Sequence, residues 1–130
     1  MSDGQVTPVD ANGILIVDDS EFLRNRMRDA LEQLGYLVVG EAANGNDAVT
    51  AYRELRPALV TMDVVMPNLD GISAVRAIRG LDPGAKVIMV TSMGNQDKVL
   101  ESLRAGAMNF VVKPFTVDQI ERVVRRVLPA

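Results

Sequence analysis

The chain has 130 residues, of which 48% are hydrophobic and 24% are charged, as is ordinary for one soluble globular domain. Its formal net charge is −3, which argues against non-specific binding to nucleic acid or to an anionic membrane. Cysteine and histidine are absent, which excludes disulfides, thiolate or imidazole metal ligands and imidazole-activated nucleophiles, so any metal must be held by oxygen.

Residues 1–12 are polar and show no periodicity, so we expect a flexible N-terminal tail followed by one domain over 13–128. No apolar run is long enough for a membrane span, and the N-terminus lacks a secretory signal pattern. We therefore expect a cytoplasmic protein that does not contact a membrane.

Short apolar runs predict five strands. The first is continuous and rich in β-branched residues, as is typical of a strand buried on both faces of a parallel sheet. The expected strands are 14–17, 36–42, 59–62, 87–90 and 109–112.

Each expected strand is followed by a segment with apolar residues at helical spacing. The expected helices are 20–34, 47–55, a segment between turns at 70–71 and 82–84, a segment marked by Val99, Leu100 and Leu103 that ends near Gly106, and a segment that begins at Thr116 and runs to Val127. Glycine and proline supply several of the stops, including Gly35 and Pro57.

Five repeats of strand then helix predict an α/β fold in which helices cover both faces of a parallel sheet. We expect a doubly wound, flavodoxin-like domain with five strands and five helices. The strand order 2-1-3-4-5 is adopted from known folds of this class and does not follow from the spacing. In such sheets, ligands bind at the carboxyl ends of the strands.

Polar side chains stand at the carboxyl ends of four expected strands. They are Asp18, Asp19, Asp63, Thr91 and Lys113. Asp63 interrupts an apolar run, and a carboxylate removed from water needs a partner or a metal. Because parallel strands end at one edge of the sheet, we expect the five side chains to converge there.

Three carboxylates at one edge repel one another by about 1–4 kcal/mol per pair at 4 Å, and one lysine offsets only part of this. A divalent cation held by oxygen would relieve it, and Mg²⁺ is the cation that suits carboxylates together with a phosphate. A carboxylate, a hydroxyl and an ammonium beside Mg²⁺ suit phosphoryl transfer. The carboxylate can itself be the nucleophile and form an aspartyl phosphate.

Five motifs, in this order and at this spacing, resemble the response-regulator receiver domain, and among its members the stand-alone chemotaxis receivers. The motifs are Ile14-Leu15-Ile16-Val17-Asp18-Asp19-Ser20, Met62-Asp63-Val64-Val65-Met66-Pro67-Asn68-Leu69-Asp70-Gly71, Val90-Thr91-Ser92-Met93-Gly94, Ala105-Gly106-Ala107 and Phe110-Val111-Val112-Lys113-Pro114-Phe115. Each motif alone is weak, and the resemblance covers Gly13 to Leu128.

The resemblance implies a role for each residue of the cluster. Asp63 would accept the phosphoryl group from a phosphohistidine of a separate histidine kinase or phosphotransfer domain. Asp18 and Asp19 would hold Mg²⁺ together with Asp63 and the backbone carbonyl of Val65. Lys113, followed by a cis peptide bond to Pro114, would pair with Asp63 and then with the phosphoryl oxygens. The protein would be a switch and not an enzyme.

The resemblance also implies how the signal leaves the site. Thr91 would donate its hydroxyl to the phosphoryl group and draw the loop 92–95 inward. Phe110 holds the position of the family's aromatic switch, although it could instead be a core aromatic. The readout surface would be the fourth helix, fifth strand and fifth helix, which would bind a downstream target such as a flagellar motor switch protein. We expect a monomer.

For several residues, the sequence leaves two interpretations open. Asp19 or Ser20 could cap the first helix. Phe22 could pack at the margin of the core or form an apolar contact for the phosphotransfer domain. Arg122, Arg125 and Arg126 could be a solvated face or a partner contact.

The positions two residues after Asp63 and Thr91 are Val65 and Met93, where receivers with fast self-dephosphorylation carry an amide or an acid. Two apolar side chains there favour a longer-lived phosphoryl group.

A magnesium-dependent aspartyl phosphatase is a rival class, but it needs an acid at the place of Val65. A flavodoxin-like nucleotide binder would place its phosphate against Asp18 and Asp19, which would repel it. Within the leading class, the chain could be the receiver of a longer regulator whose output is transcription or a phosphorelay.

Overall fold

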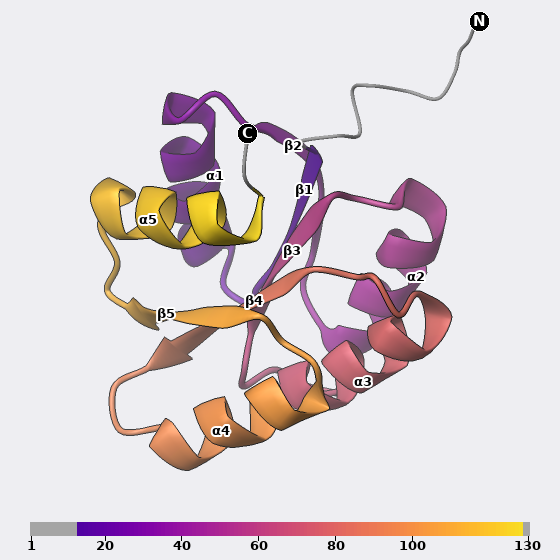
Figure 1. Ribbon diagram of the computed structural model, residues 1–130. Coiled ribbons are helices and arrows are strands. Elements are labelled where there is room, and N and C mark those ends of the chain that lie inside the picture. The colour runs from indigo at the N-terminus through magenta and orange to yellow at the C-terminus, as the bar shows by residue number, and fades with distance from the viewer. Residues whose placement is uncertain (1–12, 129–130) are drawn as a thin grey trace, which may run out of the picture.

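Five parallel strands form one sheet in the order β2-β1-β3-β4-β5 (Figure 1). The computed structural model describes residues 13–128, so the tail expected at 1–12 lies outside the described residues. The strands are β1 (Gly13–Val17), β2 (Leu37–Ala42), β3 (Leu59–Asp63), β4 (Val87–Ser92) and β5 (Asn109–Lys113). The helices are α1 (Glu21–Gln33), α2 (Gly45–Leu55), α3 (Gly71–Leu81), α4 (Gln96–Ala105) and α5 (Val117–Val127). The doubly wound fold and its strand order are confirmed.

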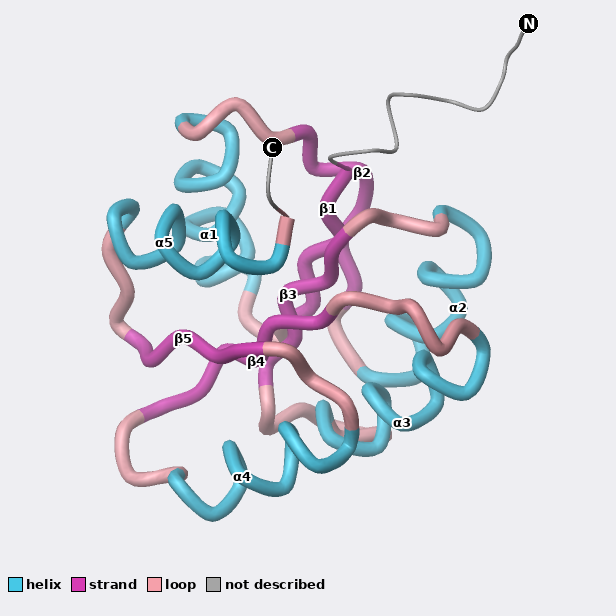
Figure 2. The backbone as a smooth tube through the Cα atoms, viewed as in Figure 1, coloured by secondary structure: helices cyan, strands magenta, loops and turns pink. Residues whose placement is uncertain are grey.

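Helices cover both faces of the sheet, with α1 and α5 on one face and α2, α3 and α4 on the other (Figures 1 and 2). Successive strand residues point to opposite faces, so Leu15 and Val17 pack toward α2 and α3 while Ile14 and Ile16 pack toward α1 and α5. This burial on both faces explains why β1 and most residues of β3 and β4 are apolar.

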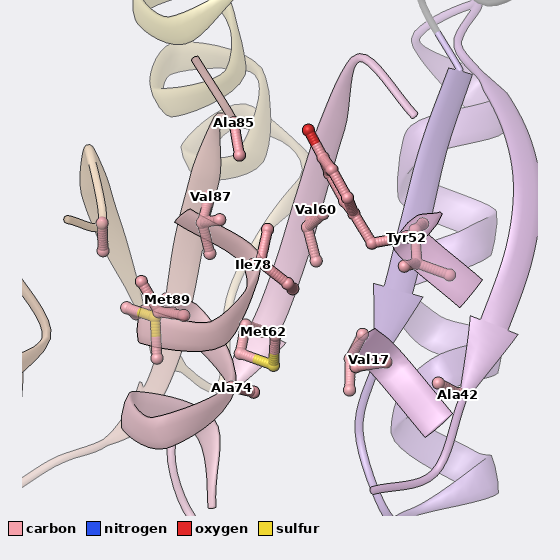
Figure 3. Packing of buried hydrophobic residues seen from close by; sticks show 14 of the residues in the cluster. Val17, Ala42, Tyr52, Val60, Met62, Ala74, Ile78, Ala85, Val87 and Met89 are labelled. Atoms are coloured by element: carbon pink, nitrogen blue, oxygen red, sulfur yellow. The ribbon is translucent and has the colours of Figure 1, made fainter. Parts of the chain in front are cut away.

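The core on the α2 and α3 face consists of strand residues and helix residues that interdigitate (Figure 3). Met62 and Met89 come from the centre of the sheet, and Ile78 of α3 is fully buried against them. Tyr52 of α2 lies at the margin of this cluster, where its hydroxyl donates a 2.6 Å hydrogen bond to Oδ2 of Asp82. Among residues 13–128, no helix is both long and apolar enough to cross a bilayer.

Side-chain caps set where most helices begin. Ser20 accepts from the Leu23 amide at α1, and Asp70 accepts from the Ser73 amide at α3. The second helix begins two residues before the expected position 47, because Asn44 caps it by accepting from the Asp47 amide. Apolar spacing cannot mark such a start, because the first turn carries polar residues.

The fourth helix forms as expected, but its apolar stripe is not covered by the core. Leu100 is 52% exposed and Leu103 37% exposed, whereas Ser102 is fully buried. The Ser102 hydroxyl donates a 2.7 Å hydrogen bond to the carbonyl of Lys98, so its burial leaves no unsatisfied donor. The face of α4 that meets α3 is therefore the small-residue face, and the larger apolar residues remain at the surface.

The start of α3 lies against the backbone of the last residue of β3. A Cβ added at Gly71 would lie 2.1 Å from the carbonyl oxygen of Asp63, whereas a Cβ added at Gly80 of the same helix would meet nothing within 4 Å. The Gly71 amide also donates a 3.0 Å hydrogen bond to the Val64 carbonyl. Glycine at position 71 therefore permits the close approach of α3 to the end of β3.

Gly71→Ala should destabilise the fold by about 1–3 kcal/mol, because either β3 or the start of α3 must shift to accept the methyl group. Gly80→Ala is the matched control, and it should stabilise by about 0.5–1 kcal/mol because alanine restricts the unfolded chain. Urea unfolding followed by circular dichroism measures both changes. A Gly71→Ala variant as stable as Gly80→Ala would contradict the tight approach.

Candidate functional site

Strand register brings the sequence-predicted side chains to one edge of the sheet. Val17 pairs with Met62 and Asp63 pairs with Val90, so Asp18 and Asp63 lie at neighbouring strand ends. At the other side of β4, Ser92 pairs with Lys113, the last residue of β5. Thr91 stands one residue after the partner of Asp63.

Asp18, Asp19 and Asp63 form an acidic triad at this edge. Each offers one carboxylate oxygen, and the three oxygens lie within 4.8 Å of one another. Asp18 and Asp63 are each only 6% exposed, whereas Asp19 is exposed to solvent. The sequence-based expectation that the three carboxylates converge is confirmed.

Lys113 bridges the two buried carboxylates. Its Nζ lies 3.2 Å from Oδ2 of Asp18 and 3.3 Å from Oδ1 of Asp63. The peptide bond between Lys113 and Pro114 is cis, as the family resemblance implied. The site therefore places one ammonium among three carboxylates.

The charge balance of the triad is unfavourable without a further cation. Burial and the charge of Asp18 raise the pKa of the Asp63 carboxyl to about 6, although Lys113 acts in the opposite direction. A carboxylate that Lys113 cannot fully compensate is the kind of group that a bound cation stabilises. Because the triad supplies only oxygen, it fits a hard divalent metal ion.

The loop after Asp63 is tied to β4 and α3. The Val64 amide donates a 3.1 Å hydrogen bond to the carbonyl of Val90, and the Val64 carbonyl accepts from Gly71. The Val65 side chain that follows is 60% exposed. The contribution of the Val65 carbonyl to a metal site stays a prediction.

Thr91 and Phe110 lie in different surroundings. Thr91 is 2% exposed, and its hydroxyl donates a long 3.3 Å hydrogen bond to the Ser92 carbonyl. Phe110 is 39% exposed and belongs to neither core cluster, so the interpretation as a core aromatic is wrong. Both line an apolar groove of about 410 Å³ that also includes Leu100 and Leu103 of α4.

The structure decides between two interpretations of the turn after β1. Ser20 is the residue that caps α1, and its own amide donates a 2.9 Å hydrogen bond to Oδ1 of Asp18. The side chain of Asp19 is therefore not the cap of α1. The carboxylate of Asp19 lies with those of Asp18 and Asp63 instead.

Two patches that the sequence analysis left with two interpretations lie on the surface: the apolar residue Phe22 and a group of three arginines in α5. Phe22 is 66% exposed, with the Arg26 guanidinium 5.7 Å from its ring centroid, so it does not pack into the core. Arg122, Arg125 and Arg126 are exposed, and Arg125 pairs with Glu121 at 3.1 Å. This exposure is compatible with both interpretations of the three arginines, a solvated face and a partner contact, and neither patch contacts the acidic triad.

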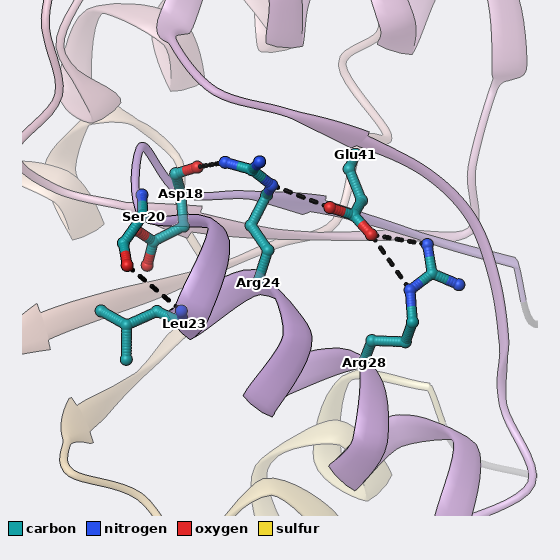
Figure 4. A network of polar contacts seen from close by, with 6 residues as sticks. All are labelled: Asp18, Ser20, Leu23, Arg24, Arg28 and Glu41. Carbon is teal, nitrogen blue, oxygen red and sulfur yellow. Dashed lines mark hydrogen bonds and ion pairs between the residues drawn. The ribbon is translucent and has the colours of Figure 1, made fainter.

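Sequence reasoning missed Arg24 and Glu41, which are linked to Asp18 of the triad by hydrogen bonds (Figure 4). Arg24 NH1 donates a 2.6 Å hydrogen bond to the backbone carbonyl of Asp18, and its Nε donates to Glu41 of β2 at 2.8 Å. From its position in the expected helix, the sequence identified Arg24 only as a polar residue. Its partners come from a turn and another strand, so no local pattern could identify them.

Comparison with known proteins agrees with this geometry. The response regulator receiver domain family matches residues 14–125. A chemotaxis protein CheY of Thermotoga maritima is 45% identical over 114 residues, which cover 88% of this chain and 95% of that protein. A Bacillus subtilis protein named CcdB is 47% identical over 115 residues, which cover 88% of this chain and 96% of that protein.

The fold has a similar counterpart among solved structures. A crystal structure described as the CheX-CheY-BeF3-Mg+2 complex from Borrelia burgdorferi superimposes with a TM-score of 0.86 at 32% identity. The match covers 91% of this chain and 90% of the other.

Asp63→Asn tests the cost of the buried charge in protein kept free of metal by a chelator. The pKa of Asp63 is about 6 in the folded protein against 3.8 without perturbation, so the folded state binds the proton more tightly. The carboxylate therefore costs stability progressively as the pH rises through this window. We expect the variant to be more stable than wild type by about 1–2 kcal/mol near neutral pH, with a smaller gain at pH values below the window.

Denaturant unfolding at about pH 4 and about pH 7.5 measures this dependence. Asp29→Asn, at an exposed position of α1, is the control and should change stability by less than about 0.5 kcal/mol at either pH. The interpretation fails if Asp63→Asn destabilises the protein near neutral pH, or if its gain is the same at both pH values.

Proposed function

This chain belongs to the response regulator receiver family, and on that premise we propose that it is a phosphoryl-accepting switch of a two-component system. The observation that carries the proposal is the buried Asp63 carboxylate, held beside Asp18 and Lys113 at the carboxyl edge of the sheet. We place the protein in the cytoplasm, where a histidine kinase or phosphotransfer domain would supply the phosphoryl group.

Asp63 is the proposed nucleophile. An oxygen of its carboxylate forms a bond to phosphorus while the bond between phosphorus and the donor imidazole breaks, and the electron pair leaves with the imidazole nitrogen. The site works mainly by positioning and by neutralising charge, as is general for phosphoryl transfer. Lys113, already 3.3 Å from Asp63, pairs with the added phosphoryl oxygens as a mobile point charge.

We assign the metal site to Mg²⁺, held by Asp18, Asp19, Asp63 and the backbone carbonyl of Val65. When bound, Mg²⁺ would supply positive charge against the phosphoryl oxygens. The support from this chain is its all-oxygen triad with a single compensating lysine. The Borrelia burgdorferi relative, whose structure is described with Mg and BeF3, supports the same choice.

The proposed switch begins at Thr91. Its hydroxyl makes only a long bond to the neighbouring Ser92 carbonyl, so it can turn to a phosphoryl oxygen at little cost. The phosphoryl group then favours the conformation with the loop after β4 drawn inward, which shifts an existing equilibrium. Phe110 lines the same groove as Thr91 and also lies beside Arg122 and Val123 of α5 in a second groove. A change of the loop would therefore alter the surface of α4, β5 and α5.

Chemotaxis is the proposed setting, with a flagellar motor switch protein as the proposed target. The support is the similarity to CheY proteins along almost their whole length. The comparable similarity to a protein with another name is the reason to test the target directly. Affinity capture with the beryllofluoride-treated protein should recover a motor switch component; recovery of a transcription or sporulation component would favour the alternative of a non-chemotaxis regulator.

The aspartyl phosphatase class receives no support from the site. Such an enzyme needs an acid two residues after its nucleophile, and Val65 occupies that position with its side chain in solvent. We therefore regard self-dephosphorylation as a property of the switch and not as an enzymatic function.

Asp63→Asn should abolish labelling by acetyl phosphate in the presence of Mg²⁺, because the amide cannot act as the nucleophile. Intact-mass spectrometry measures the phosphoryl adduct. Asp29→Asn should be labelled as wild type is. Full stoichiometric labelling of Asp63→Asn would remove the assignment of the phosphoacceptor.

Val65→Asn combined with Met93→Glu should shorten the life of the phosphoryl group by roughly tenfold, because polar groups there can orient the attacking water. Both side chains are exposed, at 60% and 80%, so stability should change little. Loss of the adduct with time gives the rate, and Val65→Ala with Met93→Ala is the control. An unchanged decay rate in the polar variant would contradict the prediction that the two apolar side chains prolong the life of the phosphoryl group.

A further inference from the structure

Asp18 is held by three hydrogen bonds and one ion pair. Its amide donates to the Ala42 carbonyl at the end of β2 at 3.1 Å, and its Oδ1 accepts from the Ser20 amide at 2.9 Å. Its Oδ2 faces Lys113 at 3.2 Å. The third hydrogen bond comes from Arg24, whose NH1 lies 2.6 Å from the Asp18 carbonyl oxygen.

The Arg24 guanidinium joins three parts of the chain (Figure 4). It belongs to α1, it donates to the turn after β1 through NH1, and it donates to Glu41 of β2 through Nε at 2.8 Å. The Arg24 side chain is only 16% exposed, so water competes little for these bonds. Hydrogen bonds to a charged donor are also stronger than neutral ones.

Glu41 is in turn held by a second arginine. Arg28 donates to Oε2 of Glu41 through Nε at 3.0 Å and through NH2 at 2.6 Å, which leaves Oε1 for Arg24. The two arginines lie one helical turn apart on the same face of α1. Arg28 thus shares the acceptor of Arg24 but does not contact Asp18, which makes it a matched control.

The carbonyl that Arg24 binds belongs to the peptide plane between Asp18 and Asp19. Because a peptide unit is planar, its orientation sets the last backbone angle of Asp18 and the first of Asp19. Those two angles direct both carboxylates relative to Asp63. Because Asp19 is exposed, the direction of its side chain depends more on the backbone than on packing.

We propose that Arg24, held by Glu41, is a positioning residue that orients the Asp18–Asp19 pair for a divalent cation. It does so through the backbone and touches neither the cation nor the phosphoryl group. The edge strand β2 thereby contributes to the metal site through Glu41, although β2 places no ligand in it. The proposal rests on the metal site of the proposed function.

Two simpler roles give different expectations. If Arg24 acted only through its charge, its removal would strengthen cation binding, because a nearby positive charge would be lost. If it served only stability, Arg24→Ala and Arg28→Ala would leave the affinity of the folded protein for Mg²⁺ unchanged. Positioning alone predicts weaker binding in a protein that remains folded.

The test is calorimetric titration of the full chain with MgCl₂. Arg24→Ala should bind Mg²⁺ about tenfold more weakly than wild type, and Arg28→Ala should stay within about twofold, on the scale of residues that orient metal ligands. Circular dichroism in chelator, with thermal unfolding, shows that each variant is folded at the titration temperature. Arg24→Ala that is folded and binds Mg²⁺ as tightly as wild type, or more tightly, overturns the proposal.

Arg24→Lys and Glu41→Gln keep the inference testable if Arg24→Ala does not fold. Lysine retains the charge but lacks the planar fork that reaches both acceptors, so its Mg²⁺ affinity should fall between those of alanine and arginine. Glu41→Gln should weaken Mg²⁺ binding less than Arg24→Lys does, since the amide oxygen still accepts from Arg24. Wild-type affinity in both variants overturns the proposal. Failure of wild type itself to bind Mg²⁺ would instead remove the metal assignment of the proposed function.

Discussion

The repulsion among three carboxylates at one edge of a parallel sheet is the constraint on which the rest of the site depends. Asp18, Asp19 and Asp63 lie together because their strands end at the same edge, where Lys113 pairs with Asp18 and Asp63 and offsets part of their charge. The sheet tolerates this cost because the apolar strands behind the site are buried on both faces. Asp63, whose pKa is raised to about 6 by burial and by Asp18, is incompletely compensated, and a bound cation would offset both its charge and the negative charge that a phosphoryl group adds.

Local packing gives the site a rigid side and a side that can change. On the β1 and β3 side, Asp18 is fixed by three hydrogen bonds and an ion pair with Lys113, and the close approach of Gly71 to Asp63 leaves no room for a methyl group. On the β4 and β5 side, Thr91 has one long hydrogen bond, and the large residues of α4 stay at the surface. A phosphoryl group would thus form on the rigid side and be sensed on the other.

The bridge from Arg24 to Glu41 extends the rigid side to the edge strand of the sheet. β2 supplies no residue to the acidic triad, yet it receives the Asp18 amide at Ala42 and holds Arg24 through Glu41. A site assembled from strand ends is therefore supported by a helix and a strand that sequence motifs do not mark.

The sequence by itself determined the alternation of strands and helices, because buried strands and amphipathic helices leave different apolar periods. It also placed the five polar residues at strand ends, and it identified Asp63 as the exceptional charge in an apolar run. The early start of α2 and the choice of Ser20 over Asp19 as the cap rest on local hydrogen bonds that apolar spacing does not mark, so the structure decided them. The exposure of Phe110 depends on how distant segments pack, and only the tertiary structure decided it. The bonds of Arg24 to Asp18 and Glu41 belong to the same group, because an arginine on a helix face shows no partner until the chain has folded.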